Sequence, residues 1–335
     1  MAEPGSDAWL ASVTETILEP ERRIIDPHHH LWATAAGMWG QYELGNLRAD
    51  TGSGHNIEKT VFIECRSGYR EDGPEHLRPI GETEYVAGVA AESARRDDTA
   101  TIAAIVGHAN LTLGDGLEDV IAAHEAAGSG LFRGIRHAGP FDTTGTLMNP
   151  GRNTESPYLN PDFAKGVQTL GRLGYTYDTW HFHHQNRDYL ALARACPDTI
   201  MVLDHFGTPL GVGPYAGRQD EIFEQWKADI AAIAECPNVV AKLGGMAMPD
   251  NGFGWHQDAA PPSSDTFVEA QRRYFMHTIE CFGPDRCMFE SNYPVDRLSV
   301  SYHVLWNAFK KLVADFSDDD KDAMFYGTAA RVYRI

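Results

Sequence analysis

The chain contains 335 residues, of which 43% are apolar, and carries a formal net charge of −19 at pH 7 with a pI near 5.1. Its length suits one barrel of roughly 250 residues with insertions, and its apolar content is enough for a large buried core. The acidic balance disfavours binding to nucleic acid or to anionic membrane surfaces, which attract basic proteins, so we expect a small-molecule partner.

The chain shows no sign of membrane insertion or export. No apolar run approaches the roughly 20 residues that a membrane-spanning helix needs, and the N-terminal segment has no basic stretch followed by an apolar one. We therefore expect a cytoplasmic protein. Residues 1–335 are expected to form a single domain, in which residues 1–21 are an N-terminal extension. The sequence leaves open whether the chain forms a homo-oligomer.

Short β-branched or apolar runs alternate with longer segments of helical periodicity, which predicts repeated β-α units around a parallel sheet. Strands are expected, in chain order, at residues 23–30, 59–66, 101–108, 132–138, 174–183, 200–205, 239–244 and 287–292. Helices are expected at residues 82–96, 117–127, 161–173, 186–195, 220–235, 264–282, 301–314 and 318–330. Eight such strands close a barrel, so the predicted fold class is α/β, a (β/α)₈ TIM barrel.

Long segments rich in Gly, Pro and Asn follow the predicted strands rather than the helices. They cover residues 32–58, 67–81, 139–160, 207–217 and 246–263. Each leaves the C-terminal end of a strand, which is the face of such barrels where active sites form. The functional site is therefore expected among these insertions.

The first predicted strand ends in the segment Asp26-Pro27-His28-His29-His30. Side chains alternate along a strand, so His28 and His30 share one face and can bind one metal ion, whereas His29 points the other way. Two histidines with this spacing at a strand end therefore predict a metal site.

The same alternation brings further polar side chains to the barrel mouth. Arg136, at the end of the fourth strand, would grip an anionic substrate, although an ion pair with Asp142 or Glu64 is an equal alternative. Lys242, at the end of the seventh strand, is interpreted as structural. The other inward-pointing candidates are Glu64 and Arg66 from the second strand, His181 and His183 from the fifth, His205 from the sixth, and Glu290 and Asn292 from the eighth.

The Asp26-x-His28-x-His30 motif resembles the first-strand signature of the amidohydrolase superfamily, particularly the lactonase and decarboxylase branches called amidohydrolase family 2. The likeness extends through residues 132–137, 202–207, 287–296 and 327–333, in the family's order and spacing. It implies a (β/α)₈ barrel, a divalent metal, and either hydrolysis of lactones or amides or non-oxidative decarboxylation. His205 matches the sixth-strand histidine of that family.

The chain departs from the resemblance at Asn292, because most relatives end the eighth strand with an aspartate. An amide has no acid–base form near neutral pH and does not act as a general base. Two carboxylates are available as catalytic replacements. Glu290 lies two residues earlier on the same strand face, and Asp296 follows Pro294 in a loop that can reach the mouth.

Four imidazoles and two carboxylates are candidate metal ligands, enough for one or two divalent ions. Zinc or manganese is expected, and iron also fits this mixture of donors. The candidates are His28, His30 and His205 for the principal metal, and Glu64, His183 and Glu290 for a second, with Arg136 orienting the substrate.

These features predict a metal-dependent hydrolase, of the lactonase type that opens a ring in a small carboxylated or aromatic, cyclic catabolite. Two alternatives stay open. Barrels similar to this one include a dinuclear non-haem iron monooxygenase, and the related decarboxylases share the same motifs.

Overall fold

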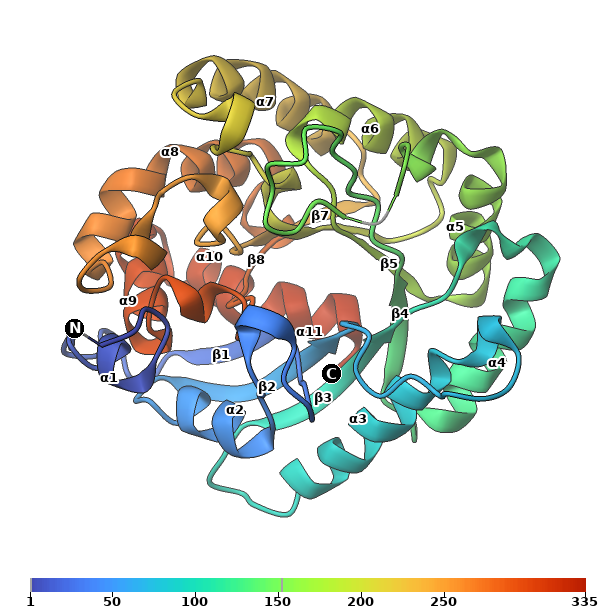
Figure 1. The fold of residues 1–335 in the computed structure, drawn as a ribbon, viewed down its shortest axis with the longest axis horizontal. Coiled ribbons are helices and arrows are strands. Elements are labelled where there is room, and N and C mark those ends of the chain that lie inside the picture. The colour runs from blue at the N-terminus through green and yellow to red at the C-terminus, as the bar shows by residue number, and fades with distance from the viewer. Residues whose placement is uncertain (1, 152) are drawn as a thin grey trace.

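The computed structural model describes residues 2–151 and 153–335. Eight parallel strands follow one another around a barrel, each hydrogen-bonded to the next in chain order (Figure 1). They are β1 (Arg23–His29), β2 (Asn56–Ile63), β3 (Thr101–Gly107), β4 (Phe132–Arg136), β5 (Thr176–Thr179), β6 (Met201–Leu203), β7 (Val239–Leu243) and β8 (Cys287–Phe289). The segment after β8 reaches β1, because the His30 amide donates to the Tyr293 carbonyl at 2.8 Å. The predicted (β/α)₈ barrel is confirmed.

The helices lie around the outside of the barrel, except for the last, which crosses one end of it (Figure 1). They are α1 (Asp7–Leu10), α2 (Leu44–Thr51), α3 (Ile80–Ser93), α4 (Leu117–Ala127), α5 (Pro161–Leu173), α6 (Asn186–Ala195), α7 (Gln219–Ala234), α8 (Ser264–Phe282), α9 (Tyr302–Leu312), α10 (Asp318–Asp322) and α11 (Thr328–Tyr333). The predicted bounds of α4, α5, α6 and α8 are confirmed to the residue.

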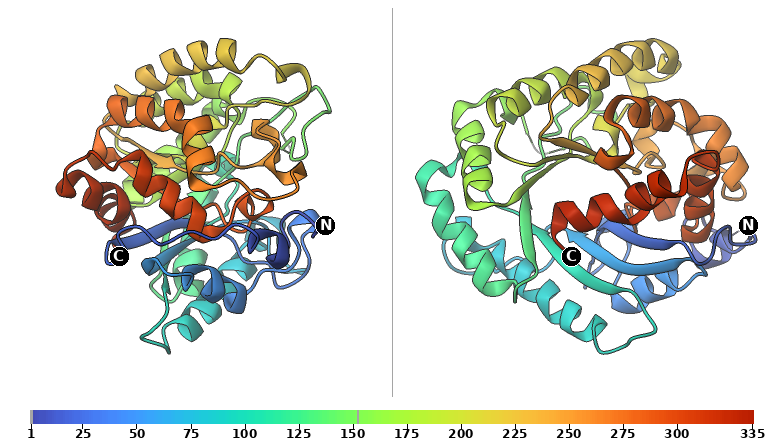
Figure 2. Two further views of the ribbon diagram at one scale, coloured as in Figure 1. Left: turned by 90° about the vertical axis from the view of Figure 1, so that its left-hand side faces the viewer. Right: turned by 180° about the vertical axis from the view of Figure 1, so that it is seen from behind.

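The strands are apolar on both faces because each faces a different part of the core. Their outer side chains pack against the helices, and their inner side chains fill the barrel. At one end of the barrel the inner core includes Ala329, Val332 and Tyr333 of α11, which crosses that end as the red helix in Figure 2. The helix α11 therefore plugs the barrel opposite the strand ends that carry the candidate site.

Several predicted boundaries were wrong, including that of the second strand, which ends at Ile63 rather than at residue 66. The strand predicted at residues 174–183 ends at Thr179, so His183 lies in a single 3-10 turn, His183–Gln185. The segment 32–58, expected to be an insertion loop, contains α2, which Glu43 and Asn46 cap reciprocally. The eighth strand ends at Phe289, and the helix predicted at residues 318–330 is interrupted by the π-helical segment Ala323–Gly327.

The N-terminal segment packs onto the barrel. Trp9 is 1% exposed, and the Glu15 carboxylate accepts hydrogen bonds from the backbone amide and the hydroxyl of Ser264, at 2.7 and 2.5 Å. These bonds satisfy free donors at the start of α8. Within residues 2–151 and 153–335, none of the helices combines the length and the apolar character needed to cross a membrane.

Candidate functional site

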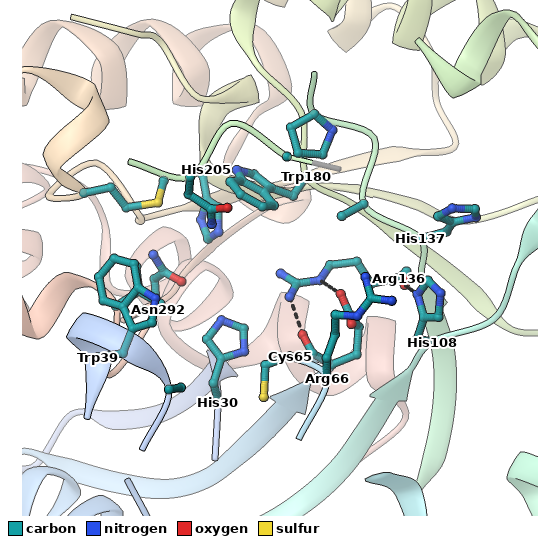
Figure 3. Close-up of a pocket in the computed structure, with 18 of the residues that line it drawn as sticks. His30, Trp39, Cys65, Arg66, His108, Arg136, His137, Trp180, His205 and Asn292 are labelled. Carbon is teal, nitrogen blue, oxygen red and sulfur yellow. Dashed lines mark hydrogen bonds and ion pairs between the residues drawn. The ribbon is translucent and has the colours of Figure 1, made fainter. Parts of the chain in front are cut away.

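A cavity of about 600 Å³ opens at the C-terminal ends of the strands (Figure 3). It lies on the side predicted from the position of the long insertions. Three tryptophans, Trp32, Trp39 and Trp180, supply much of its apolar wall. Its charged and imidazole-bearing lining residues are His30, Glu64, Arg66, His108, Arg136, His137 and His205.

Three imidazoles meet at the floor of this cavity. The ring centroid of His28 lies 5.0 Å from that of His30 and 4.6 Å from that of His205. All three rings are buried, and burial lowers the pKa of each: that of His205 to about 3, and those of His28 and His30 well below the usual value. They are therefore neutral near pH 7, which is the form that binds metals.

The protein orients two of these rings through their Nδ1 atoms. Nδ1 of His30 lies 2.8 Å from the Ile63 carbonyl oxygen, so it must carry the proton and donate. Nδ1 of His205 lies 2.7 Å from Oε1 of Glu290. In both residues Nε2 is the nitrogen left for a ligand, which is the arrangement seen in metal sites where an outer group orients the imidazole.

Glu290 lies between two of the imidazoles. Besides its bond to His205, its Oε2 atom lies 2.6 Å from Nδ1 of His28. Its side chain has no exposed surface and is not among the residues that line the cavity. Burial raises the pKa of Glu290 to about 8. Glu290 therefore contacts the imidazoles rather than a substrate.

Asp204 joins the imidazole cluster, although it was not among the residues predicted for the site. Atoms of His28, Asp204 and His205 that can bind a metal all lie within 4.8 Å of one another. Among the described residues, Oδ2 of Asp204 has no hydrogen-bond donor, whereas Oδ1 lies 3.1 Å from Nζ of Lys242. Burial raises its pKa to about 7. Buried carboxylate oxygens without donors are suited to a bound cation.

The backbone explains how two successive residues both reach the centre. β6 ends at Leu203, and His205 has a φ of 53°, in the left-handed region. Strand alternation would send Asp204 and His205 to opposite faces, but it does not apply once the backbone leaves the extended conformation. The Asp-His pair in the sequence is the one signal that could have drawn attention to Asp204.

Lys242 places a buried positive charge beside Asp204. Its Nζ atom lies 3.1 Å from Oδ1 of Asp204 and 3.0 Å from Oδ2 of Asp178, and all three side chains are fully buried. The Tyr333 hydroxyl of α11 donates to the same oxygen of Asp178. A buried ammonium is stable only when it is paired in this way.

Arg136 and Glu64 form an ion pair in the cavity wall. Nε of Arg136 donates to Oε1 of Glu64 at 3.0 Å, and the same guanidinium also donates to the Glu64 carbonyl (Figure 3). The sequence left two roles open for Arg136, binding an anionic substrate or pairing with an acid of this chain. The structure shows the ion pair with Glu64. Within the part of the chain that the structure describes, Glu64 is the only carboxylate lining the cavity.

Asp296, one of the two carboxylates predicted to replace the eighth-strand aspartate, lies beside Asn292. Asn292 lines the cavity and donates from Nδ2 to Oδ1 of Asp296 at 2.9 Å. Asp296 is fully buried, and its other oxygen accepts from the Ala247 amide at 3.1 Å. Burial raises the pKa of Asp296 to about 8. Asp296 therefore holds Asn292 and does not line the cavity.

The structure does not bring His183 to the imidazole cluster. Its Nδ1 atom accepts from the Leu210 amide at 3.3 Å, and its ring lies against Tyr215. His181 is also engaged elsewhere, with Nε2 at 2.9 Å from the side-chain oxygen of Asn186. Neither residue lines the cavity, because β5 ends before the chain reaches them.

Comparison with known proteins finds likeness along nearly the whole chain. A family model described as Amidohydrolase matches residues 25–335. The uncharacterized protein y4mH of Sinorhizobium fredii is 31% identical over 325 residues, covering 93% of this chain and 98% of that protein. L-fucono-1,5-lactonase of Burkholderia multivorans is 28% identical over 322 residues, covering 93% and 96%.

L-rhamnono-gamma-lactonase of Scheffersomyces stipitis is 24% identical over 360 residues, covering 93% of this chain and 99% of that enzyme. Among solved structures, an amidohydrolase from Burkholderia multivorans with bound zinc matches with a TM-score of 0.73 and 25% identity. That match covers 93% of this chain and 99% of the other.

Proposed function

Because the chain belongs to the amidohydrolase family, we propose that it is a metal-dependent hydrolase that opens the ring of a small lactone. It is an enzyme of a family whose similar members include two named lactonases. One observation carries the proposal. Neutral imidazoles and one buried carboxylate oxygen of Asp204 that has no hydrogen-bond donor meet at the floor of one cavity.

The donor set fits a divalent cation. His28, His205 and Asp204 would hold it, and His30 would add its Nε2 atom. Zinc is the first candidate, because a similar amidohydrolase carries zinc, and manganese is the second. When bound, such a metal supplies Lewis acidity toward the lactone carbonyl and lowers the pKa of a bound water toward neutrality.

Glu64 is proposed to take the proton that the attacking water loses. It is the one carboxylate among the described cavity-lining residues, and Asn292 has no acid–base form for this task. The pair with Arg136 fixes the Glu64 carboxylate in the wall of the cavity. Glu290 acts through His28 and His205, whose rings it orients.

The cavity suits a ring-containing substrate. Its volume of about 600 Å³ lies within the range of small-molecule sites, roughly 300–1,000 Å³. Trp32, Trp39 and Trp180 offer flat apolar surfaces beside the polar floor. A small cyclic ester would therefore have both an apolar wall and the cluster of metal ligands within reach.

The proposal is tested by metal analysis together with a screen of lactones. Protein purified without added metal is expected to contain zinc or manganese, and chelation should abolish ring opening until the metal is restored. His30→Ala and His205→Ala should lower turnover by about a hundredfold or more. His184→Ala, an exposed histidine beside the barrel mouth, is the matched control.

Other outcomes would contradict this reaction. Oxygen-dependent turnover with bound iron would favour the monooxygenase alternative, and release of carbon dioxide from an aromatic acid would favour the decarboxylase. Full activity of both histidine variants in metal-free protein would contradict the metal centre itself.

A further inference from the structure

We infer that Arg66, His137 and Asn110 form a carboxylate-binding arm of the cavity, so that the substrate is a lactone with a carboxylate remote from its ring carbonyl. This inference rests on the proposed function and narrows its substrate class. It starts from the guanidinium of Arg66, which lines the cavity and has no ion-pair partner among the described residues.

Arg66 follows β2 and extends into the cavity (Figure 3). Its φ of 66° lies in the left-handed region, so the backbone turns at this residue instead of continuing the strand. Within the described residues its guanidinium makes no hydrogen bond or ion pair, and its one recorded contact is with the Tyr69 ring, 5.7 Å from the ring centroid. All its N–H donors are therefore available to a ligand.

Arg136, which also lines the cavity, has an ion-pair partner. Arg136 is neutralised by Glu64, which is the only carboxylate among the described lining residues. Among the described lining residues, Arg66 is thus a charge without an ion-pair partner, in a protein whose formal net charge is −19. A guanidinium in a concave site attracts an anion and binds a carboxylate through two parallel hydrogen bonds.

His137 provides a second donor. The Leu111 amide donates to its Nδ1 atom at 3.2 Å, so this nitrogen carries no proton. Burial, together with His108 and Arg66, lowers the pKa of His137 to about 3, and the neutral ring therefore has its proton on Nε2. His137 lines the cavity, and no described residue accepts from this Nε2–H group.

Asn110 provides a third donor. Its Oδ1 atom accepts from the amide of Thr112 at 3.1 Å, which assigns the oxygen and leaves Nδ2 as the other end of the amide. No described residue accepts from Nδ2, and the residue lines the cavity. A guanidinium, an imidazole N–H and an amide N–H₂ together match the acceptor-only character of a carboxylate.

Arg66 and His137 lie apart from the imidazole cluster. In Figure 3, Arg66, His108 and His137 lie on one side of the cavity, and His30, His205 and Asn292 lie on the other, with Arg136 between them. A substrate held at both sides must therefore carry its anionic group at one end and its scissile ester at the other. A carboxylate on the ring carbon next to the reacting carbonyl would not span the two.

The experiment compares two lactones that share one ring, one with a remote carboxylate and one with the corresponding carboxamide. At low ionic strength the wild-type enzyme is expected to favour the carboxylate at least about tenfold in kcat/KM. In Arg66→Gln this preference should fall by about tenfold or more. Arg70→Gln is the matched control, because Arg70 lies in the same loop and pairs with Glu84 on the surface.

A binding measurement separates this inference from the proposed function. Calorimetry with glutarate, which is not hydrolysed, should show binding to the wild-type protein and to Arg70→Gln, and at least about tenfold weaker binding to Arg66→Gln. If both lactones are opened but Arg66→Gln keeps the wild-type preference, the inference is overturned and the lactonase stands. If no lactone is opened yet glutarate binding depends on Arg66, the proposed reaction fails and the anion site stands.

Discussion

Nδ1 of His205 lies 2.7 Å from one oxygen of Glu290, whose other oxygen lies 2.6 Å from Nδ1 of His28. One carboxylate therefore fixes two imidazoles that come from opposite halves of the chain. Neither ring can turn without losing this contact, so the geometry of the proposed metal centre depends on a residue that never faces the substrate.

The first prediction concerns that carboxylate. Glu290→Gln should lower the affinity for zinc by about 10- to 100-fold, because an amide is a weaker acceptor for the imidazole N–H group of His205. Competition with a chromophoric chelator measures the affinity. Glu280→Gln, on the exposed side of α8, is the control and should bind zinc like the wild type. Equal affinities for all three proteins would show that Glu290 has no part in the centre.

The second prediction concerns the pH dependence of metal binding. Burial raises the pKa of Glu290 to about 8, so this carboxyl holds a proton below pH 8, and the carboxylate that accepts from the imidazole of His205 forms when that proton leaves. Affinity should therefore fall by up to about tenfold for each pH unit below 8 and level off above it. Asp204, with a pKa of about 7, adds a second proton below pH 7. In Glu290→Gln the dependence between pH 7 and 8 should disappear.

The third prediction separates two roles of Glu64. If it accepts the proton of the attacking water, Glu64→Gln should lower kcat by about a hundredfold or more while the metal content stays at the wild-type level. If it binds the metal, as the sequence predicted, the same variant should lose metal. Measuring metal by mass spectrometry beside the steady-state rates distinguishes these results.

The fourth prediction concerns the hydrogen bond between Asn292 and Asp296. Asn292→Asp would place two carboxyl groups in the position of the 2.9 Å bond to Asp296. Loss of the donor should cost about 1–3 kcal/mol in the free energy of unfolding. Exchanging both residues, in Asn292→Asp with Asp296→Asn, restores one donor and one acceptor and should recover most of the loss. Urea unfolding of the three proteins tests this, and no recovery in the double variant would contradict it.

The fifth prediction concerns the plug at the other end of the barrel. Tyr333→Phe removes the hydrogen bond to Asp178, the buried partner of Lys242. The free energy of unfolding should fall by about 1–3 kcal/mol, as for other bonds to charged groups. Tyr326→Phe is the control, since its hydroxyl accepts from Arg23 at the surface. A loss of the same size in the control would mean that burial of the bond is unimportant.

Much of the architecture was predictable, because each strand and helix carries its own periodicity. His28 and His30 were correctly expected on one side of β1, since that strand is extended up to the histidines. The exact ends of the strands were harder. The rule of alternation assumes an extended backbone, and the chain leaves it at Arg66, His205 and Asn292, all with positive φ.

The pairing of charges could not be predicted from the sequence. Arg136 had several acids within reach, and only the packed barrel shows that Glu64 is its partner. The same holds for Asp204, which had no motif of its own beyond its neighbour His205, and for Arg66, whose importance lies in the absence of a partner among the described residues.

The place of α11 has a consequence for biosynthesis. Ala329, Val332 and Tyr333 complete the inner core that Ile25 and Val61 begin. A ribosome makes Ile25 and Val61 roughly 300 residues before the segment that covers them, at about 5–20 residues per second. In a nascent chain, Ile25 and Val61 would thus wait tens of seconds for the segment that covers them.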